Sequence, residues 1–165
     1  MYSRNHRRMV NTPVSKQKIE TMDIVLRLAT ENDIEVIFDI RTSVKENHLS
    51  KQQLTELGIT EPVILSLIQN TSTVWLAEVQ HQVCGFSIVD LTEGSIFAMF
   101  VHPDFEAKGV GTALLKKAED LLFNSCQEIC LETDQKSRAF EFYLRQGWCV
   151  SEYFDNGDVR MLKTR

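Results

Sequence analysis

The segment FAMFVHPDFEAKGVGTALLKKA, residues 97–118, predicts a strand, a glycine turn and a helix in succession. Its first five residues are apolar, and after Gly109 and Gly111 apolar residues recur with the spacing of a helix that buries one face. A helix N-terminus presents unpaired N–H groups and a partial positive charge, and glycine lets an anion approach the backbone closely. The segment therefore predicts a pyrophosphate site at the glycine turn.

The flanking sequence predicts a mixed α/β fold. The expected strands are residues 24–28, 73–79, 83–90, 95–101, 129–133, 148–154 and 159–163, and the expected helices are 30–44, 50–57, 60–68, 110–122 and 136–146. Short turns join the second, third and fourth strands, which is typical of an antiparallel meander. The strand–helix–strand connection through the glycine turn predicts a right-handed crossover between parallel strands, hence an α+β or α/β fold around a mixed sheet.

Composition indicates an ordinary globular chain. Of 165 residues, 43% are hydrophobic and 25% charged, and no apolar run approaches the ~20 residues of a membrane span. Without a signal-peptide pattern either, we expect a cytoplasmic protein with no membrane partner. The net charge is −5, but residues 1–20 carry +4 and leave −9 for the remainder. We expect a basic, disordered tail over residues 1–22, one domain over residues 23–165, and no nucleic-acid partner.

The four cysteines, Cys84, Cys126, Cys130 and Cys149, form no C-x-x-C pair, and no histidine stands beside them at metal-ligand spacing. They are expected to be free thiols, with neither a disulfide nor a structural metal.

Several phosphate-binding turns contain glycine. A P-loop requires a lysine after its last glycine, whereas Gly111 is followed by Thr112 and Ala113. A Rossmann fingerprint requires a third glycine where Leu114 stands, and the meander before the turn argues against that nicotinamide-binding class. A purely structural glycine turn stays open at this point.

Two motifs carry a resemblance to a known family. Val101-His102-Pro103 followed by residues 106–111 (EAKGVG) resembles the acetyl-CoA-binding motif [QR]-x-x-G-x-[GA] of GNAT-type N-acetyltransferases. Residues 139–148 (AFEFYLRQGW) are similar to the later helix of that family, with its A-x-x-F-Y-x-x-x-G-[FW] pattern. The element order also matches, so the resemblance covers about residues 23–163.

The resemblance implies a GNAT-like sheet of about seven strands flanked by about four to five helices, in which strands 95–101 and 129–133 splay apart. Acetyl-CoA would be the co-substrate: its pantetheine would pair with the backbone of Met99 and Val101. Its pyrophosphate would rest on the N–H groups of Lys108, Gly109, Val110, Gly111 and Thr112.

This sequence departs from the family pattern at two positions. Glu106 stands where Gln or Arg is usual, and we expect its side chain to face solvent. Lys136 stands where the later motif often has a cofactor-binding asparagine, which leaves that contact without a counterpart.

The implied reaction is direct transfer of an acetyl group from the thioester to an amine. Tyr143 is the candidate general acid for the leaving thiolate, because a phenol is protonated at neutral pH. Glu46, His48 and Glu93 are candidate general bases, because the resemblance implies that their regions border the acceptor side. None of the three is favoured over the others. The acceptor is expected to be a small-molecule or peptide amine, and no sequence motif identifies it. The resemblance also makes a homodimer plausible. A non-catalytic acyl-CoA-binding module is the alternative.

Overall fold

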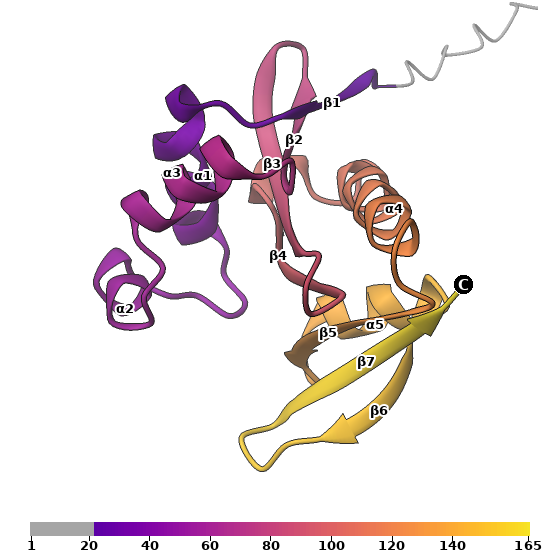
Figure 1. Ribbon diagram of the computed structural model, residues 1–165. Coiled ribbons are helices and arrows are strands. Elements are labelled where there is room, and N and C mark those ends of the chain that lie inside the picture. Colours follow the sequence, from indigo (N-terminus) through magenta and orange to yellow (C-terminus); the bar gives the residue numbers. More distant parts are fainter. Residues whose placement is uncertain (1–21) are drawn as a thin grey trace, which may run out of the picture.

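The computed structural model describes residues 22–165, and one seven-stranded sheet forms its centre (Figure 1). The strands lie in the order β1-β2-β3-β4-β5-β7-β6, and every neighbouring pair is antiparallel except β4 with β5. The strands are β1 (Ile24–Leu28), β2 (Val74–Val79), β3 (Gln82–Asp90), β4 (Ser95–Val101), β5 (Glu128–Asp134), β6 (Cys149–Tyr153) and β7 (Asp158–Thr164). The basic segment expected to be disordered lies, up to residue 21, outside the described residues.

Five α-helices and two short 3₁₀ turns complete the described part of the chain. The helices are α1 (Ile34–Ser43), α2 (Lys51–Glu56), α3 (Glu61–Asn70), α4 (Val110–Phe123) and α5 (Arg138–Arg145), and the turns are η1 (Glu31–Asp33) and η2 (Pro103–Phe105). Capping residues set several of these starts. Ser50 Oγ accepts the Gln53 N–H, and Ser137 Oγ accepts the Phe140 N–H. Because Ser137 is the N-cap, α5 begins at Arg138, two residues later than the sequence predicted.

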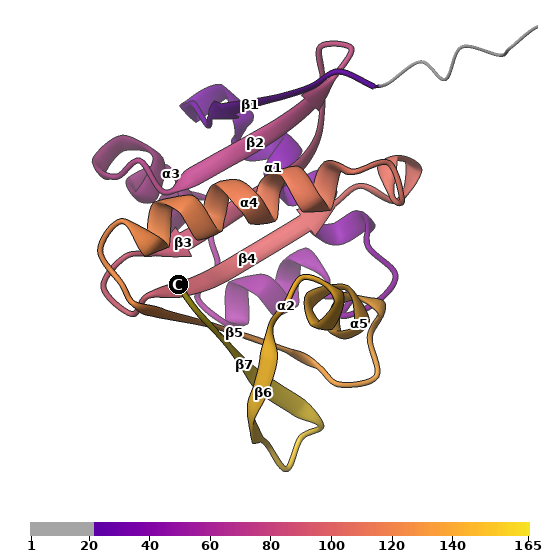
Figure 2. The same ribbon diagram turned by 90° about the vertical axis from the view of Figure 1, so that its right-hand side faces the viewer.

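Helices cover both faces of the central strands. Helices α1 and α3 lie on one face and α4 crosses the other, while α5 packs beside β5 in the C-terminal part (Figures 1 and 2). The core is divided accordingly. Phe86 and Ile88 of β3 pack toward Ile37 and Ile40 of α1. Cys84 is the extra residue of a β-bulge in the same strand, so its side chain lies on the opposite face and packs with Leu114 of α4.

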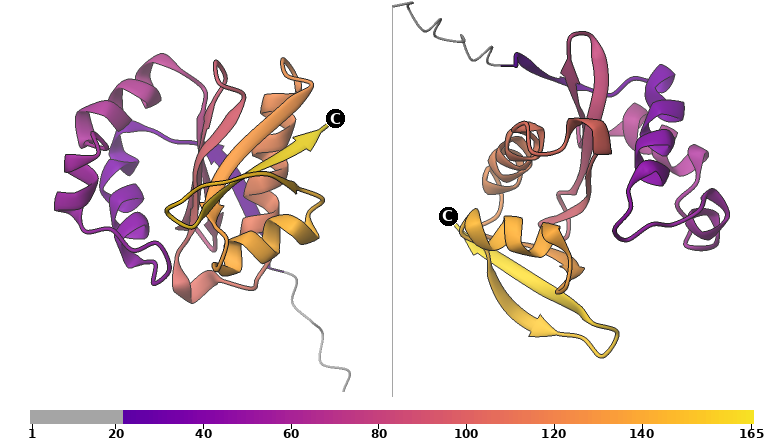
Figure 3. Two further views of the ribbon diagram at one scale, coloured as in Figure 1. Left: turned by 90° about the horizontal axis from the view of Figure 1, so that it is seen from below. Right: turned by 180° about the vertical axis from the view of Figure 1, so that it is seen from behind.

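The C-terminal elements pack around a core that they share with β3, β4 and α4, which contribute Val89, Ile96 and Leu115. Tyr143 of α5 and the fully buried Trp148 pack with Leu131 of β5 and Met161 of β7. Viewed from below and from behind, β5, β6 and β7 turn away from the plane of β2–β4 (Figure 3). The sheet is therefore continuous in order but divided at the β4–β5 boundary.

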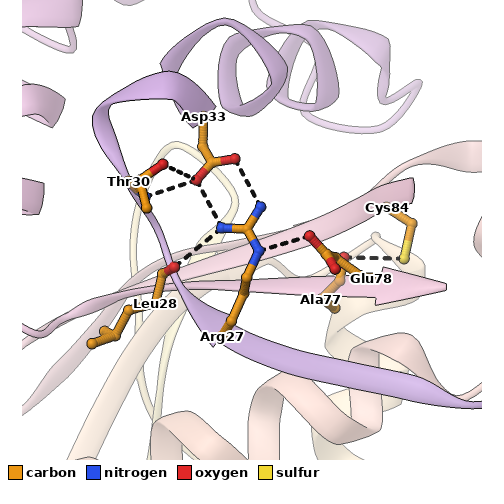
Figure 4. Close-up of polar contacts among 7 residues, drawn as sticks. All are labelled: Arg27, Leu28, Thr30, Asp33, Ala77, Glu78 and Cys84. Atoms are coloured by element: carbon orange, nitrogen blue, oxygen red, sulfur yellow. Dashed lines mark hydrogen bonds and ion pairs between the residues drawn. The ribbon is translucent and has the colours of Figure 1, made fainter. Parts of the chain in front are cut away.

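Arg27 on β1 fastens the start of α1 to the sheet (Figure 4). Its Nε donates to Glu78 Oε1 at 2.6 Å, and Nη1 and Nη2 donate to the two Asp33 carboxylate oxygens at 2.8 and 2.9 Å. Asp33 also accepts the Thr30 N–H at 2.7 Å, so a capping box is present. The Arg27 guanidinium holds the pKa of the Asp33 carboxyl at about 2, well below its ordinary value of 3.8.

The expected mixed fold, meander and parallel pair are confirmed. A hairpin through Asn156 and Gly157 joins β6 to β7. Neither 3₁₀ turn was predicted. From Met22 onward, the chain contains no helix with the length and apolar character needed to span a bilayer.

Candidate functional site

A β-bulge in β4 separates this strand from β5. Ile88 of β3 pairs with Ala98 and Val89 pairs with Ile96, so Phe97 is an extra residue without a partner on β3. A bulge of this kind bends its strand and increases the local twist. Between β4 and β5 one residue pair is in register, Ser95 with Cys130. The two parallel strands therefore part beyond Ser95.

The parting leaves one edge of β4 unpaired. The His102 N–H donates to the Cys84 carbonyl at 2.8 Å, so His102 points its backbone groups toward β3. Backbone groups alternate in direction along a strand. Met99 and Val101 therefore direct their N–H and C=O groups away from β3, toward the gap. The family resemblance assigns the same two residues to the pantetheine arm.

The glycine turn places free N–H groups beside the end of that edge. Gly109 is the N-cap of α4 with a left-handed φ of 88°, and no side chain caps the helix. The first backbone bond of the helix runs from the Ala113 N–H to the Gly109 carbonyl at 3.1 Å, so the N–H groups of Val110, Gly111 and Thr112 have no partner within the helix. Ala107 is also left-handed, with φ 57°, which is uncommon outside glycine and concentrates at functional sites.

Gly111, in the glycine turn, lies next to the other two predicted parts of the site, the end of β4 and the helix that carries Tyr143. A Cβ built on Gly111 would lie 3.9 Å from Val101 Cγ2 and 3.8 Å from Phe142 Cζ. The turn therefore contacts both the end of β4 and the helix that carries Tyr143. Lys108 is exposed, with its Nζ 5.4 Å from the centre of the Phe105 ring.

Tyr143 has a buried ring. Its side chain packs edge-on against Phe142 and Trp148, and Met99 of β4 packs against the same cluster. Burial raises the pKa of the phenol above its ordinary value of 10.0, so the hydroxyl is protonated at neutral pH. Within residues 22–165 the hydroxyl has no hydrogen-bond partner, yet the only fully enclosed polar side-chain atom without a partner is Nε of Arg160. The Tyr143 hydroxyl is therefore not fully enclosed by the described residues.

Arg138 connects the loops at the wide end of the parting, where β4 and β5 both end. Its Nη2 donates to Glu106 Oε2 at 3.1 Å, and its backbone N–H donates to Glu46 Oε2 at 2.9 Å. Glu106 lies partly exposed, in line with the expectation that it faces solvent, and its carboxylate also pairs with the first residue of α5. Sequence reasoning missed Arg138, whose only signal was its position directly before the Ala139 motif.

The base candidates lie apart from one another. Glu46 is held at the start of α5, and His48 places Nδ1 3.1 Å from the Val44 carbonyl oxygen. Glu93 is exposed in the β3–β4 turn, where its N–H donates to Asp90 Oδ1. None of the three hydrogen-bonds to Tyr143 in the described part of the chain. The Lys136 side chain is exposed, and its N–H donates to Asp134 Oδ1. Residues 22–165 hold no cluster of three or more His, Cys, Asp or Glu suited to a metal ion.

Comparison with known proteins agrees with this geometry. The model of the acetyltransferase (GNAT) domain family matches residues 70–150, which include β4, the glycine turn and Tyr143. An uncharacterized N-acetyltransferase of Methanocaldococcus jannaschii is 31% identical over 97 residues, covering 53% of this chain and 62% of that protein. The chain thus resembles the GNAT acetyltransferase domain over residues 70–150, and it spans less than two thirds of the length of this relative.

Solved structures of GNAT proteins share the fold. The PaiA N-acetyltransferase of Thermoplasma acidophilum, solved in complex with coenzyme A, superposes with a TM-score of 0.72 at 20% identity, covering 87% of this chain and 100% of that one. A GCN5-related N-acetyltransferase of Rhodopseudomonas palustris gives a TM-score of 0.71 at 21% identity, covering 87% and 98%. The expectation of a GNAT-like sheet with a splayed parallel pair is confirmed.

Proposed function

We propose that this protein belongs to the GNAT superfamily and is an acetyl-CoA-dependent N-acetyltransferase that moves an acetyl group directly to an amine. The observation that carries the proposal is the single residue pair between the parallel strands β4 and β5. It leaves backbone donors and acceptors unpaired in the middle of a sheet, where an extended ligand can pair with them as an added strand would. The PaiA neighbour was solved with coenzyme A, which supports the same ligand here.

The residues present fit that ligand. Met99 and Val101 would hold the pantetheine amides, since their backbone groups face the gap. The free N–H groups from Lys108 to Thr112 at the start of α4 would hold the pyrophosphate, because a helix N-terminus favours an anion. Glu106, the one carboxylate in the motif, is neutralised by Arg138. Bound acetyl-CoA supplies an activated acyl group whose leaving group is a thiolate.

Tyr143 would stabilise the departing sulfur. Its pKa is raised by burial, so it is a weaker acid than an exposed phenol and is fully protonated. We assign it first to hydrogen-bond donation to the sulfur. The same dry surroundings raise the pKa of the leaving thiol as well, so the phenol remains the weaker acid and complete proton transfer from Tyr143 gains nothing from burial. The acetyl carbon–sulfur bond breaks as the amine nitrogen bonds to carbon, and the products are an amide and coenzyme A thiol.

The amine must lose a proton to complete the reaction. Glu46 already accepts the Arg138 N–H, so His48 or solvent is better placed to take the proton. An exposed His48 has Nε2 available while Nδ1 faces the Val44 carbonyl.

The test combines coenzyme A binding by calorimetry with thiol release from acetyl-CoA in the presence of a broad panel of amines. We expect coenzyme A to bind and at least one class of amine to release thiol, with the acetylated amine detected by mass spectrometry. Binding without transfer to any amine would favour the non-catalytic acyl-CoA-binding alternative. A protein that does not bind coenzyme A would refute both.

A further inference from the structure

A cavity of about 150 Å³ lies between β4 and the helices on its α1–α3 face, and the proposed reaction leaves its occupant open. Its walls are apolar: Ile37 and Phe38 from α1, Ile64 from α3, and Phe86, Ala98 and Phe100 from the sheet. An apolar cavity of about this size, ~150 Å³, takes a group as large as benzene. The cavity therefore accommodates one aromatic or branched aliphatic group.

Arg41 is the only charged residue in the cavity lining. Its guanidinium lies over the Phe100 ring, with Cζ 4.2 Å from the ring centre, and Nη1 donates to the Asn47 carbonyl at 3.1 Å. No carboxylate of residues 22–165 lies within 4.0 Å of the guanidinium, so Arg41 has no ion-pair partner there. Partial burial lowers its pKa, although a guanidinium stays charged at neutral pH. A half-buried cation with donors to spare is a binding site for an anion.

The cavity lies next to the proposed thioester site. Phe100 forms its wall, and the neighbouring residues Met99 and Val101 present the backbone groups assigned to pantetheine. Phe97, the bulged residue, also lines the cavity and is 55% exposed, so the cavity opens where β4 leaves β5. A molecule seated in the cavity can thus present an amine to the open edge of β4.

We propose that this cavity binds the acceptor, and that the acceptor is an apolar α-amino acid whose carboxylate pairs with Arg41. This rests on the proposed N-acetyltransferase function and names its substrate class. Three groups diverge from the α-carbon: the side chain enters the cavity, the carboxylate meets the guanidinium, and the amine faces the thioester. The amine nitrogen bonds to the acetyl carbon, the carbon–sulfur bond breaks, and the proton lost by nitrogen balances the proton gained by sulfur.

The charge of Arg41 distinguishes this acceptor from the other amines a GNAT fold could serve. A polyamine would bring further positive charge toward an unpaired guanidinium, which is unfavourable in partly desolvated surroundings. An N-terminal peptide residue has an amide in place of the carboxylate and would leave Arg41 unpaired.

The activity test compares L-phenylalanine, L-phenylalaninamide and spermidine as acceptors. We expect kcat/KM to be about 10- to 100-fold higher for the amino acid than for its amide, as a hydrogen bond between charged groups predicts. Arg41→Met should abolish that preference, and Arg41→Lys should retain part of it. Lys51→Met is the matched control, because Lys51 is a nearby cation already paired with Glu61 at 2.9 Å, and it should leave the preference unchanged.

A binding measurement separates this proposal from the proposed function. Calorimetry of N-acetyl-L-phenylalanine and its amide, without coenzyme A, should favour the carboxylate about 10-fold or more in the natural protein and not in Arg41→Met. Equal binding of the two ligands, or equal loss in the Lys51→Met control, would overturn the assignment even if coenzyme A binds and another amine is acetylated. Conversely, the carboxylate preference would stand if acetyl transfer failed.

Discussion

Tyr143 combines two features that a purely structural aromatic residue does not need. Its ring fills the core between Phe142 and Trp148, while its hydroxyl has no partner within residues 22–165 and is not enclosed. Packing of the ring needs no hydroxyl, so the hydroxyl is available for the role proposed above. The sequence pattern alone could not decide whether Tyr143 is a structural core residue or a general acid, because both roles place it on the same face of the helix.

Replacing Tyr143 with phenylalanine should separate these uses. In Tyr143→Phe the ring contacts remain, so we expect unchanged stability and nearly unchanged affinity for coenzyme A. Turnover should fall about 10²- to 10⁴-fold, the usual contribution of a positioned acid. Steady-state kinetics and calorimetry measure both quantities. Tyr153→Phe is the control, since Tyr153 is 69% exposed on β6 and its loss should change neither. Equal turnover in Tyr143→Phe would remove this residue from the mechanism.

The glycine turn and α4 act as one element. Gly109 has a left-handed φ of 88°, so the fold itself requires glycine there. Gly111 lies within the helix, and a Cβ there would make ordinary contacts at 3.8 and 3.9 Å. The fold alone therefore tolerates a side chain at 111, and the glycine is explained by close approach of the proposed pyrophosphate.

Two alanine substitutions in this turn should have opposite signatures. Gly109→Ala forces a left-handed alanine and should lower the free energy of unfolding by about 1 kcal/mol. Gly111→Ala should leave that free energy unchanged or raise it by about 0.5 kcal/mol, while weakening coenzyme A binding about tenfold or more. Denaturant unfolding and calorimetry distinguish the two. Unimpaired binding by Gly111→Ala would argue that this turn is structural.

The whole domain consists of two units joined by few backbone bonds. Between β4 and β5 there is one residue pair, so side chains supply much of the connection. Glu119 of α4 accepts the Trp148 indole N–H at 2.9 Å and pairs with Lys163 of β7 at 2.8 Å. In the N-terminal unit, the ion pair between Arg27 and Asp33 links the start of α1 to the sheet. Arg41 lies on the same helix.

The Arg27–Asp33 pair predicts how global stability depends on pH. Folding lowers the pKa of Asp33 from 3.8 to about 2, so the pair stabilises the protein above pH ~5, and this contribution is lost as pH falls from ~5 to ~2. We expect Asp33→Asn to lower the unfolding free energy at pH 7 by up to about 2 kcal/mol, and by much less near pH 2. Urea unfolding at several pH values measures this difference. The exposed Asp155→Asn should show a change within about 0.5 kcal/mol at every pH, and a pH-independent effect of Asp33→Asn would contradict the assignment.

The amino-acid sequence by itself determined the elements, their order and the glycine turn. These depend on local signals: apolar spacing, capping residues such as Ser50, and the glycines of the turn, Gly109 and Gly111. The two GNAT motifs then predicted that β4, the turn and Tyr143 form one site. Each signal is contained within a few neighbouring residues, which is why it can be read without coordinates.

Only the tertiary structure decided where β4 parts from β5, what Glu106 contacts and what Arg41 faces. The Phe97 bulge was hidden because β4 is apolar on both faces, so a one-residue slip leaves the pattern unchanged. Glu106 and Glu46 meet Arg138 across 32 and 92 residues of chain, and Arg41 lies over Phe100 from another element. Contacts of this kind depend on how separate elements pack together, and no local pattern encodes that packing.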